Sequence, residues 1–117
     1  MGLSNNKLGA TGAVEIAEKG LKGKTDLIKL SIENNGICNA GVESISKNLK
    51  DCNSFQEFYL YNNDIDDDPI DMFVEFIQRQ SDLYALGLEF NRLGYKSVTM
   101  ILRAIVNHPK LEKLFLN

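Results

Sequence analysis

The stretch Leu27–Ile37, LIKLSIENNGI, has the pattern L-x-x-L-x-L-x-x-N-x-L, with isoleucine at the third and fourth leucine positions. The pattern returns in Phe55–Ile65 as FQEFYLYNNDI and in Leu83–Leu93 as LYALGLEFNRL, each time after the same step along the chain. A further copy begins at Leu111, and the sequence stops inside it. A fixed period of about 28 residues indicates a repeat architecture, so the repeat is the unit from which the fold is predicted.

Apolar residues at the end of the motif and beyond it recur at the same step along the chain. They form three-membered columns: Ile37, Ile65 and Leu93; Val42, Ile70 and Val98; Ile45, Phe73 and Ile101; Leu49, Ile77 and Ile105. The first segment matches with a shift, because the step from Asn6 to Asn35 is one residue longer than the step from Leu21 to Leu49. We therefore expect one extra residue in the first half of that repeat relative to its second half.

These boundaries predict a single domain over 1–117, made of repeats 3–26, 27–54, 55–82 and 83–110 and a partial repeat from 111. Repeat proteins need atypical, polar terminal units to cover the ends of their cores. Since neither end of the sequence has such a unit, we expect a segment that is incomplete at both ends, taken from a longer repeat protein.

Within a repeat, the period of the apolar residues changes from that of a strand to that of a helix. Leu30 and Ile32 alternate with Ser31, as in a strand with one buried face. The asparagine that follows each strand can bond the backbone of the adjacent turn through its amide. We therefore predict a structural asparagine column, formed by Asn6, Asn35, Asn63 and Asn91.

The second half of each repeat has one apolar helical face. Asp68 and Pro69 predict a helix start, with Asp68 as the N-cap and Pro69 at the first helical position. The residues expected to pack inward are Val42, Ile45 and Leu49 in one repeat, Ile70, Phe73, Val74 and Ile77 in the next, and Val98, Ile101, Leu102 and Ile105 in the third.

The motif, its repeat period and the full helix in each second half resemble the leucine-rich repeats of the ribonuclease-inhibitor type. This resemblance covers essentially the whole chain. It implies an α/β leucine-rich-repeat solenoid, a horseshoe with parallel strands on the concave face and helices on the convex face. It also implies a surface that recognises other macromolecules, because such repeats serve unrelated partners.

Composition excludes several function classes. The net charge of −3 gives no basic footprint for nucleic acid, and no apolar run is long enough to cross a membrane. Cys38 and Cys52 form no disulfide framework, so we expect reduced thiols in the cytoplasm or another reducing intracellular compartment. We expect no cofactor and no small-molecule substrate.

Three candidate sites have weak patterns. Asp64, Asp66, Asp68 and Glu75 have the spacing of a calcium loop, but Pro69 stands where the loop needs glycine, so the acidic stretch is interpreted as a solvated turn. The single histidine, His108, sits at a helix end that suits a partial positive charge. Arg92 follows Asn91 near the expected concave edge, where GTPase activators of the Ran type, which share this repeat architecture, place an arginine.

The predicted binding surface is the concave face, where side chains between the buried columns point outward. The candidate partner-binding residues are Glu57, Tyr59, Tyr61, Glu89, Lys113 and Phe115, with Ala85 and Gly87 leaving a shallow dip between them. Exposed aromatic residues are enriched at interfaces, but they also serve cross-strand pairing, and both interpretations fit.

The sequence therefore favours a protein–protein interaction module without catalysis of its own. Its partner is expected to be another protein, or several subunits of a large complex. Two alternatives stay open, a structural subunit embedded in a multiprotein assembly and a GTPase-activating protein that uses Arg92.

Overall fold

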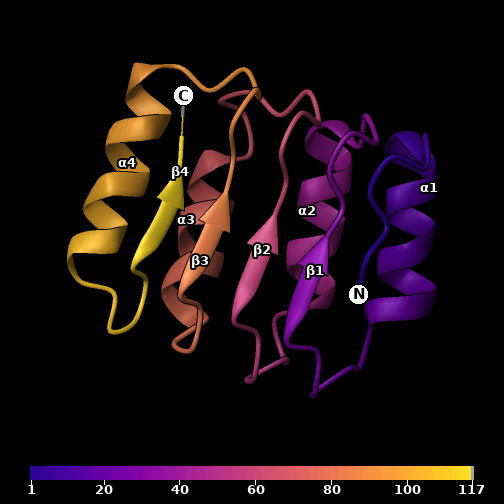
Figure 1. Ribbon diagram of the computed structural model, residues 1–117, viewed down its shortest axis with the longest axis horizontal. Coiled ribbons are helices and arrows are strands. Elements are labelled where there is room, and N and C mark those ends of the chain that lie inside the picture. The colour runs from indigo at the N-terminus through magenta and orange to yellow at the C-terminus, as the bar shows by residue number, and fades with distance from the viewer. Residues whose placement is uncertain (117) are drawn as a thin grey trace.

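The computed structural model describes residues 1–116 of the chain and contains one four-stranded sheet. The strands are β1 (Lys29–Ser31), β2 (Glu57–Tyr59), β3 (Ala85–Gly87) and β4 (Lys113–Phe115), and they lie side by side in chain order (Figure 1). All three pairings are parallel. The predicted α/β class with a parallel sheet is confirmed.

The strand register follows the constant step of the sequence repeat. Leu30 pairs with Phe58, Phe58 with Leu86, and Leu86 with Leu114. The N-terminal segment extends the sheet beyond β1, because the Leu3 amide donates to the Ser31 carbonyl at 2.7 Å. Equivalent residues of successive repeats therefore lie next to one another across the sheet.

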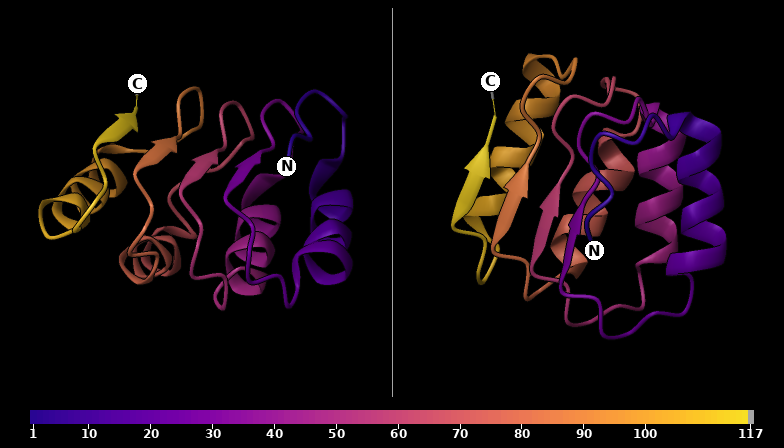
Figure 2. Two further views of the ribbon diagram at one scale, coloured as in Figure 1. Left: turned by 60° about the horizontal axis from the view of Figure 1, so that its bottom comes forward. Right: turned by 45° about the vertical axis from the view of Figure 1, so that its right-hand side comes forward.

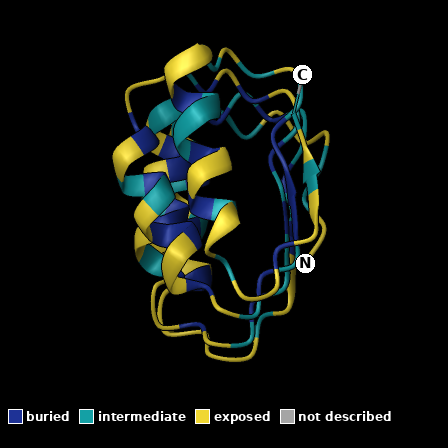
Figure 3. Ribbon diagram, turned by 90° about the vertical axis from the view of Figure 1, so that its left-hand side faces the viewer, coloured by how far each residue is buried: buried dark blue, intermediate teal, exposed yellow. Residues whose placement is uncertain are grey.

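The helices all cover the same face of the sheet (Figures 1 and 2). They are α1 (Gly9–Ile16), its continuation η1 (Ala17–Leu21), α2 (Cys38–Asn48), α3 (Ile70–Arg79) and α4 (Tyr95–Val106). The buried residues lie between the helices and the strands (Figure 3). We call the opposite face, which no helix covers, the open sheet face.

Four phenylalanines fill the middle of the core. Phe55 and Phe58 come from the β2 repeat, and their ring centroids are 5.3 Å apart in an edge-to-face arrangement. Phe73 and Phe76 reach them from α3, with Phe58 lying 6.2 and 5.9 Å from these two rings. Aromatic pairs in this range stabilise a core beyond the area that they bury. Phe55 and Phe58 stand where the other strands have leucine.

The extra residue of the first repeat is absorbed in η1, a turn of π-helix. The Lys22 amide donates to the Ala17 carbonyl at 3.0 Å, five residues back, which is the bond of a π-bulge. The wider turn lets both Ala17 and Leu21 stay fully buried. The insertion thus falls at the end of the first helix, between Ile16 and Leu21, rather than in the first half of the repeat.

Two details of the predicted helices are wrong. The N-cap of α3 is Pro69 rather than Asp68, and no side chain caps that helix. In α4, Leu102 is 48% exposed, whereas Ile101 is buried as predicted, together with Ser97 and Ala104. The sequence pattern predicted that Leu102 packs inward because it is apolar. In the structure the buried face of α4 instead includes the smaller Ser97 and Ala104.

Asp67 caps a helix of the next repeat. Its Oδ1 accepts hydrogen bonds from the Gly94 amide, at 2.7 Å, and from the Ser97 hydroxyl. Gly94 is the N-cap residue of α4 and Ser97 lies in its first turn, where the helix dipole also favours a carboxylate. The bond from Ser97, followed by that from Gly94, lowers the pKa of Asp67 below its ordinary value.

We expect Asp67→Ala to destabilise the fold at neutral pH and to do so less in acid. A carboxyl whose pKa is lowered by folding stabilises the native state above its unfolded pKa, and this contribution is lost as the pH falls through the folded pKa. Urea unfolding at about pH 7 and about pH 2 measures the difference. Asp68→Ala is the matched control, because the Asp68 carboxylate accepts no hydrogen bond within residues 1–116; an equal loss at both pH values would contradict the capping role.

Candidate binding surface on the open sheet face

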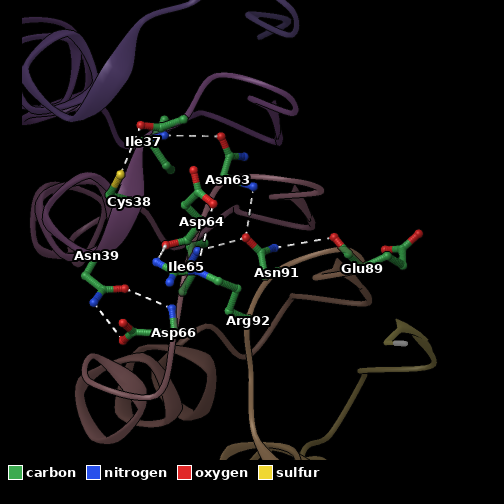
Figure 4. Close-up of polar contacts among 11 residues, drawn as sticks. Ile37, Cys38, Asn39, Asn63, Asp64, Ile65, Asp66, Glu89, Asn91 and Arg92 are labelled. Carbon is green, nitrogen blue, oxygen red and sulfur yellow. Dashed lines mark hydrogen bonds and ion pairs between the residues drawn. The ribbon is translucent and has the colours of Figure 1, made fainter.

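Asparagine side chains tie the turns above the strands to one another (Figure 4). The Asn63 Oδ1 accepts the backbone amides of Asn35 and Ile37 from the preceding repeat, at 3.0 and 3.4 Å. Its Nδ2 donates to the carbonyls of Ile32 and Leu60, each at 3.1 Å, and to a third carbonyl in its own turn. Since Asn63 is fully buried, these bonds satisfy backbone groups that no strand or helix reaches.

The other asparagines of the column bond in the same way. Asn35 accepts the amides of Asn6 and Leu8, at 2.9 and 3.3 Å, and Asn91 accepts the amide of Asn63 at 2.9 Å. Asn6 is exposed, and its Nδ2 donates to two carbonyls of its own turn. This hydrogen-bonded column, which we call the asparagine ladder, holds successive turns at a fixed spacing. It therefore also fixes the positions of the side chains that the turns present.

The residue before each ladder asparagine has a left-handed backbone. Its φ is 57° at Asn34, 53° at Asn62 and 57° at Phe90. Asparagine adopts this conformation with little penalty, whereas other side chains meet the carbonyl oxygen. Phe90 is therefore an unusual occupant of the position, and 59% of it is exposed.

Phe90 extends the candidate surface beyond the six predicted binding residues. Its ring packs edge-to-face on Tyr61, with the centroids 5.1 Å apart. A signal was available in the sequence, because Asn34 and Asn62 hold the equivalent position in the two preceding repeats. The replacement of asparagine by an aromatic residue breaks the pattern of the column.

Tyr59, the last residue of β2, is held by charged neighbours. Its hydroxyl donates to the Glu57 Oε1 at 2.7 Å, and the Lys29 ammonium lies 5.4 Å from its ring centroid. Burial, followed by the bond to Glu57, raises the pKa of Tyr59 to about 12. The phenol therefore stays neutral at physiological pH and acts as a fixed polar group. Lys113, at the start of β4, is exposed.

At the end of the strands, a pocket of about 340 Å³ opens on the same face. It is lined by Glu33, Asn34, Tyr59, Tyr61, Gly87, Glu89 and Phe115. The structure thus brings four of the six predicted binding residues together, namely Tyr59, Tyr61, Glu89 and Phe115. Glu57 and Lys113 do not line this pocket.

The shallow dip predicted at Ala85 and Gly87 is only partly right, because both residues are buried. The ring of Tyr59 leans over Gly87, and a Cβ added there would come within 3.0 Å of its Cδ1. The Glu89 Oε1 would lie 3.2 Å from the same point. Side chains from the neighbouring positions therefore partly fill the hollow over Gly87. The part of the hollow that they leave open is the pocket.

The other candidate residues lie away from this pocket. Arg92 pairs with Asp64 across the turns, with its Nε 3.8 Å from the carboxylate. Across the part of the chain that the structure describes, no three His, Cys, Asp or Glu side chains gather so as to hold a metal ion. The thiols of Cys38 and Cys52 donate to backbone carbonyls of Gly36 and Leu27.

His108 closes the turn after α4 through hydrogen bonds of its ring to the backbone. Its Nδ1 accepts the amides of Lys110 and Leu111 at 3.1 and 3.0 Å, so the proton lies on Nε2, which is 2.8 Å from the Gln80 carbonyl. The two amides need an acceptor, and a protonated Nδ1 has no free lone pair with which to accept a hydrogen bond.

Two of the solved structures that share this fold are domains of tropomodulin and leiomodin-1. The C-terminal domain of tropomodulin from Caenorhabditis elegans matches with a TM-score of 0.73 and 19% sequence identity, over 90% of this chain and 62% of that one. Leiomodin-1 actin-binding site 2 matches with a TM-score of 0.71 and 20% identity, over 90% and 60% of the two chains. This chain thus spans about three-fifths of either structure. No protein-family model and no curated protein sequence matches it.

These matches correct the resemblance to ribonuclease-inhibitor repeats, which was wrong. The tropomodulin and leiomodin domains are similar structures, and the chain has a radius of gyration of 12.7 Å, close to the roughly 13 Å of a compact domain of this length. The motif misled because its leucines and asparagine are required by strand packing and turn bonding. Any parallel strand–turn–helix repeat can meet those requirements. Within residues 1–116, no helix is both long and apolar enough to span a bilayer.

Proposed function

We propose that the chain is a protein-binding module that holds its partner on the open sheet face, at the ends of the strands and the adjoining turns. In this proposal the repeats at 3–26, 27–54, 55–82 and 83–110 stack as one domain of a leucine-rich-repeat-like solenoid, with the open sheet face as its concave side. The binding residues are Tyr59, Tyr61, Glu89, Phe90 and Phe115, with Glu57 and Lys113 beside them.

The observation that carries the proposal is the conformation and exposure of Phe90. A left-handed backbone costs a residue with a Cβ roughly 1–2 kcal/mol, and the ring recovers little of this by burial, since 59% of the residue is exposed. Stability alone would favour the asparagine found at the equivalent positions. Outliers of this kind concentrate at binding sites, and exposed aromatic rings are the usual anchors of protein interfaces.

We expect Phe90→Asn to leave the fold intact or to stabilise it by about 1 kcal/mol, because asparagine relieves the left-handed strain. The same change removes the ring that packs on Tyr61, so it should weaken partner binding by about tenfold or more. Thermal unfolding and a pull-down measure the two effects on one sample. Val106→Asn, an equal loss of an exposed apolar side chain on α4, away from the open sheet face, is the control and should bind as the wild type does; a Phe90→Asn protein that binds normally would contradict the proposal.

Actin is the first partner to test, because a solved structure that matches 90% of this chain is named as an actin-binding site of leiomodin-1. Wild-type protein is expected to bind purified actin with micromolar affinity, and Phe90→Asn should bind more weakly. Absence of wild-type binding at about 100 µM actin would remove actin as the partner. The binding-module proposal would then have to be tested with another protein.

The position of Arg92 gives no support to a GTPase-activating role. Its guanidinium is held near Asp64, with an ion pair at 3.8 Å and a hydrogen bond to the Asp64 carbonyl at 3.5 Å. The pocket residues of the open sheet face do not include it. The surface that the structure presents is suited to contact rather than to chemistry on a substrate.

A further inference from the structure

We propose that the pocket on the open sheet face receives an arginine side chain of the partner protein, with its guanidinium between the aromatic rings and against Glu89. This inference rests on the proposed function and names the chemistry of the group that the surface recognises. Its three parts are the shape of the pocket, its charge and its aromatic lining.

The shape comes from one small residue between two large ones. Tyr59, Gly87 and Phe115 are direct neighbours across β2, β3 and β4. Because Gly87 has no side chain, the Tyr59 ring can lean over it, and the space beside that ring and Phe115 belongs to a notch of about 340 Å³ that opens to solvent. Tyr61 and Glu89 lie two residues beyond the ends of β2 and β3 and also line the notch. A single extended side chain fits such a notch, whereas a helix or a strand would have to rest on its rim.

The charge of the pocket selects a cation. Two of its seven lining residues, Glu33 and Glu89, are acidic and none is basic. The Glu89 Oε1 is buried and has no hydrogen-bond partner within the described residues. A buried acceptor without a donor is unfavourable, so a donor supplied by the partner would gain more here than on an ordinary surface. Glu33 is placed at the other side, where its Oε2 accepts from the Ser4 hydroxyl at 3.2 Å.

The aromatic lining favours a guanidinium. Tyr59, Tyr61 and Phe115 surround the notch, and cations lie favourably over such rings. The chain itself already uses this contact, with the Lys29 ammonium 5.4 Å from the Tyr59 ring centroid. Arginine suits the site better than lysine, because its planar fork can stack on a ring and donate to a carboxylate at the same time.

The test uses the whole chain and a short peptide, acetyl-Gly-Gly-Arg-Gly-Gly-amide. Amide signals of Gly87, Glu89 and Phe90 are followed by NMR as the peptide is added to about 1 mM. We expect these signals to shift in a saturable way. A peptide with citrulline, the neutral isostere of arginine, is expected to bind about tenfold more weakly, and a lysine peptide should bind with intermediate strength.

Two variants separate the parts of the proposal. Glu89→Gln keeps the size of the side chain and should weaken the arginine peptide about tenfold, while Glu43→Gln, an equal charge change on the exposed side of α2, should leave it unchanged. Gly87→Ala should block the notch, because the new Cβ would lie 3.0 Å from the Tyr59 Cδ1.

Equal binding of the arginine and citrulline peptides would overturn the inference, as would shifts confined to other parts of the chain or no shifts at all. The proposed function fails by a different result, namely unaltered binding of a protein partner by Phe90→Asn. If that variant loses its partner while the arginine peptide fails to bind, the module stands and the arginine pocket does not.

Discussion

Asn63→Ala is expected to lower the free energy of unfolding by about 3–5 kcal/mol, because the change leaves several buried backbone groups without partners. The Asn63 side chain accepts two amide hydrogens and donates to three carbonyls. The residue is fully buried, so water cannot replace these bonds unless the turn opens. Urea unfolding followed by circular dichroism measures the loss.

The matched control for Asn63 is Asn6→Ala, in the same column. The Asn6 side chain is exposed and donates to the carbonyls of Leu3 and Ser4, where water can take its place. We expect this variant to lose about 1 kcal/mol. If the two variants were destabilised equally, the ladder would not be what holds the turns together.

Phe58→Ala is expected to cost about 3–5 kcal/mol, the usual loss when a buried aromatic ring is deleted. Phe58 is fully buried, and its ring lies within 5.3 to 6.2 Å of the rings of Phe55, Phe76 and Phe73. The surrounding rings cannot close a gap of that size without leaving their own contacts. Guanidinium unfolding of the purified variant gives the value directly.

Phe58→Leu tests whether the ring itself matters. Leucine occupies the paired positions Leu30 and Leu86, so it is compatible with the strand, and we expect a loss of about 1.5 kcal/mol or less. A leucine variant as unstable as the alanine variant would show that edge-to-face contacts, rather than filled volume, dominate this part of the core.

The elements that sequence reasoning placed well are those that repeat. Leu30, Phe58 and Leu86 recur at a fixed step, so their pairing across a parallel sheet follows from the spacing. Helices could be placed for the same reason, since each repeat changes from the period of a strand to that of a helix. Local geometry that is copied from repeat to repeat leaves several independent signals in one sequence.

The features that were missed depend on contacts between repeats. Asp67 caps α4 in the next repeat, a contact that no pattern within a single repeat can reveal. Leu102 was placed inside because it is apolar, although the orientation of α4 is set by how the helix packs on its neighbours. The burial of Gly87 likewise depends on the ring of Tyr59 one strand away.

For the candidate surface, the sequence identified the face but not its centre. Alternation along the strands was enough to place Tyr59, Tyr61 and Phe115 on the side away from the core. The backbone conformation of Phe90 was invisible without coordinates, and only comparison with Asn34 and Asn62 hints at it. The family was misassigned because its motif consists of scaffold residues, which any parallel strand–turn–helix repeat can have. The same residues carry no information about a partner.

The most direct test of the binding surface is site-specific photo-crosslinking. The photoreactive residue p-benzoylphenylalanine is placed at Phe90 or Phe115 on the open sheet face, or at Tyr95 or Val106 on the exposed side of α4, all of which are exposed in the structure. Each protein is irradiated in a cell extract, and covalent adducts are resolved by mass. We expect a common partner to be captured from Phe90 and Phe115 and not from Tyr95 or Val106. Capture from the two α4 positions alone would contradict the account.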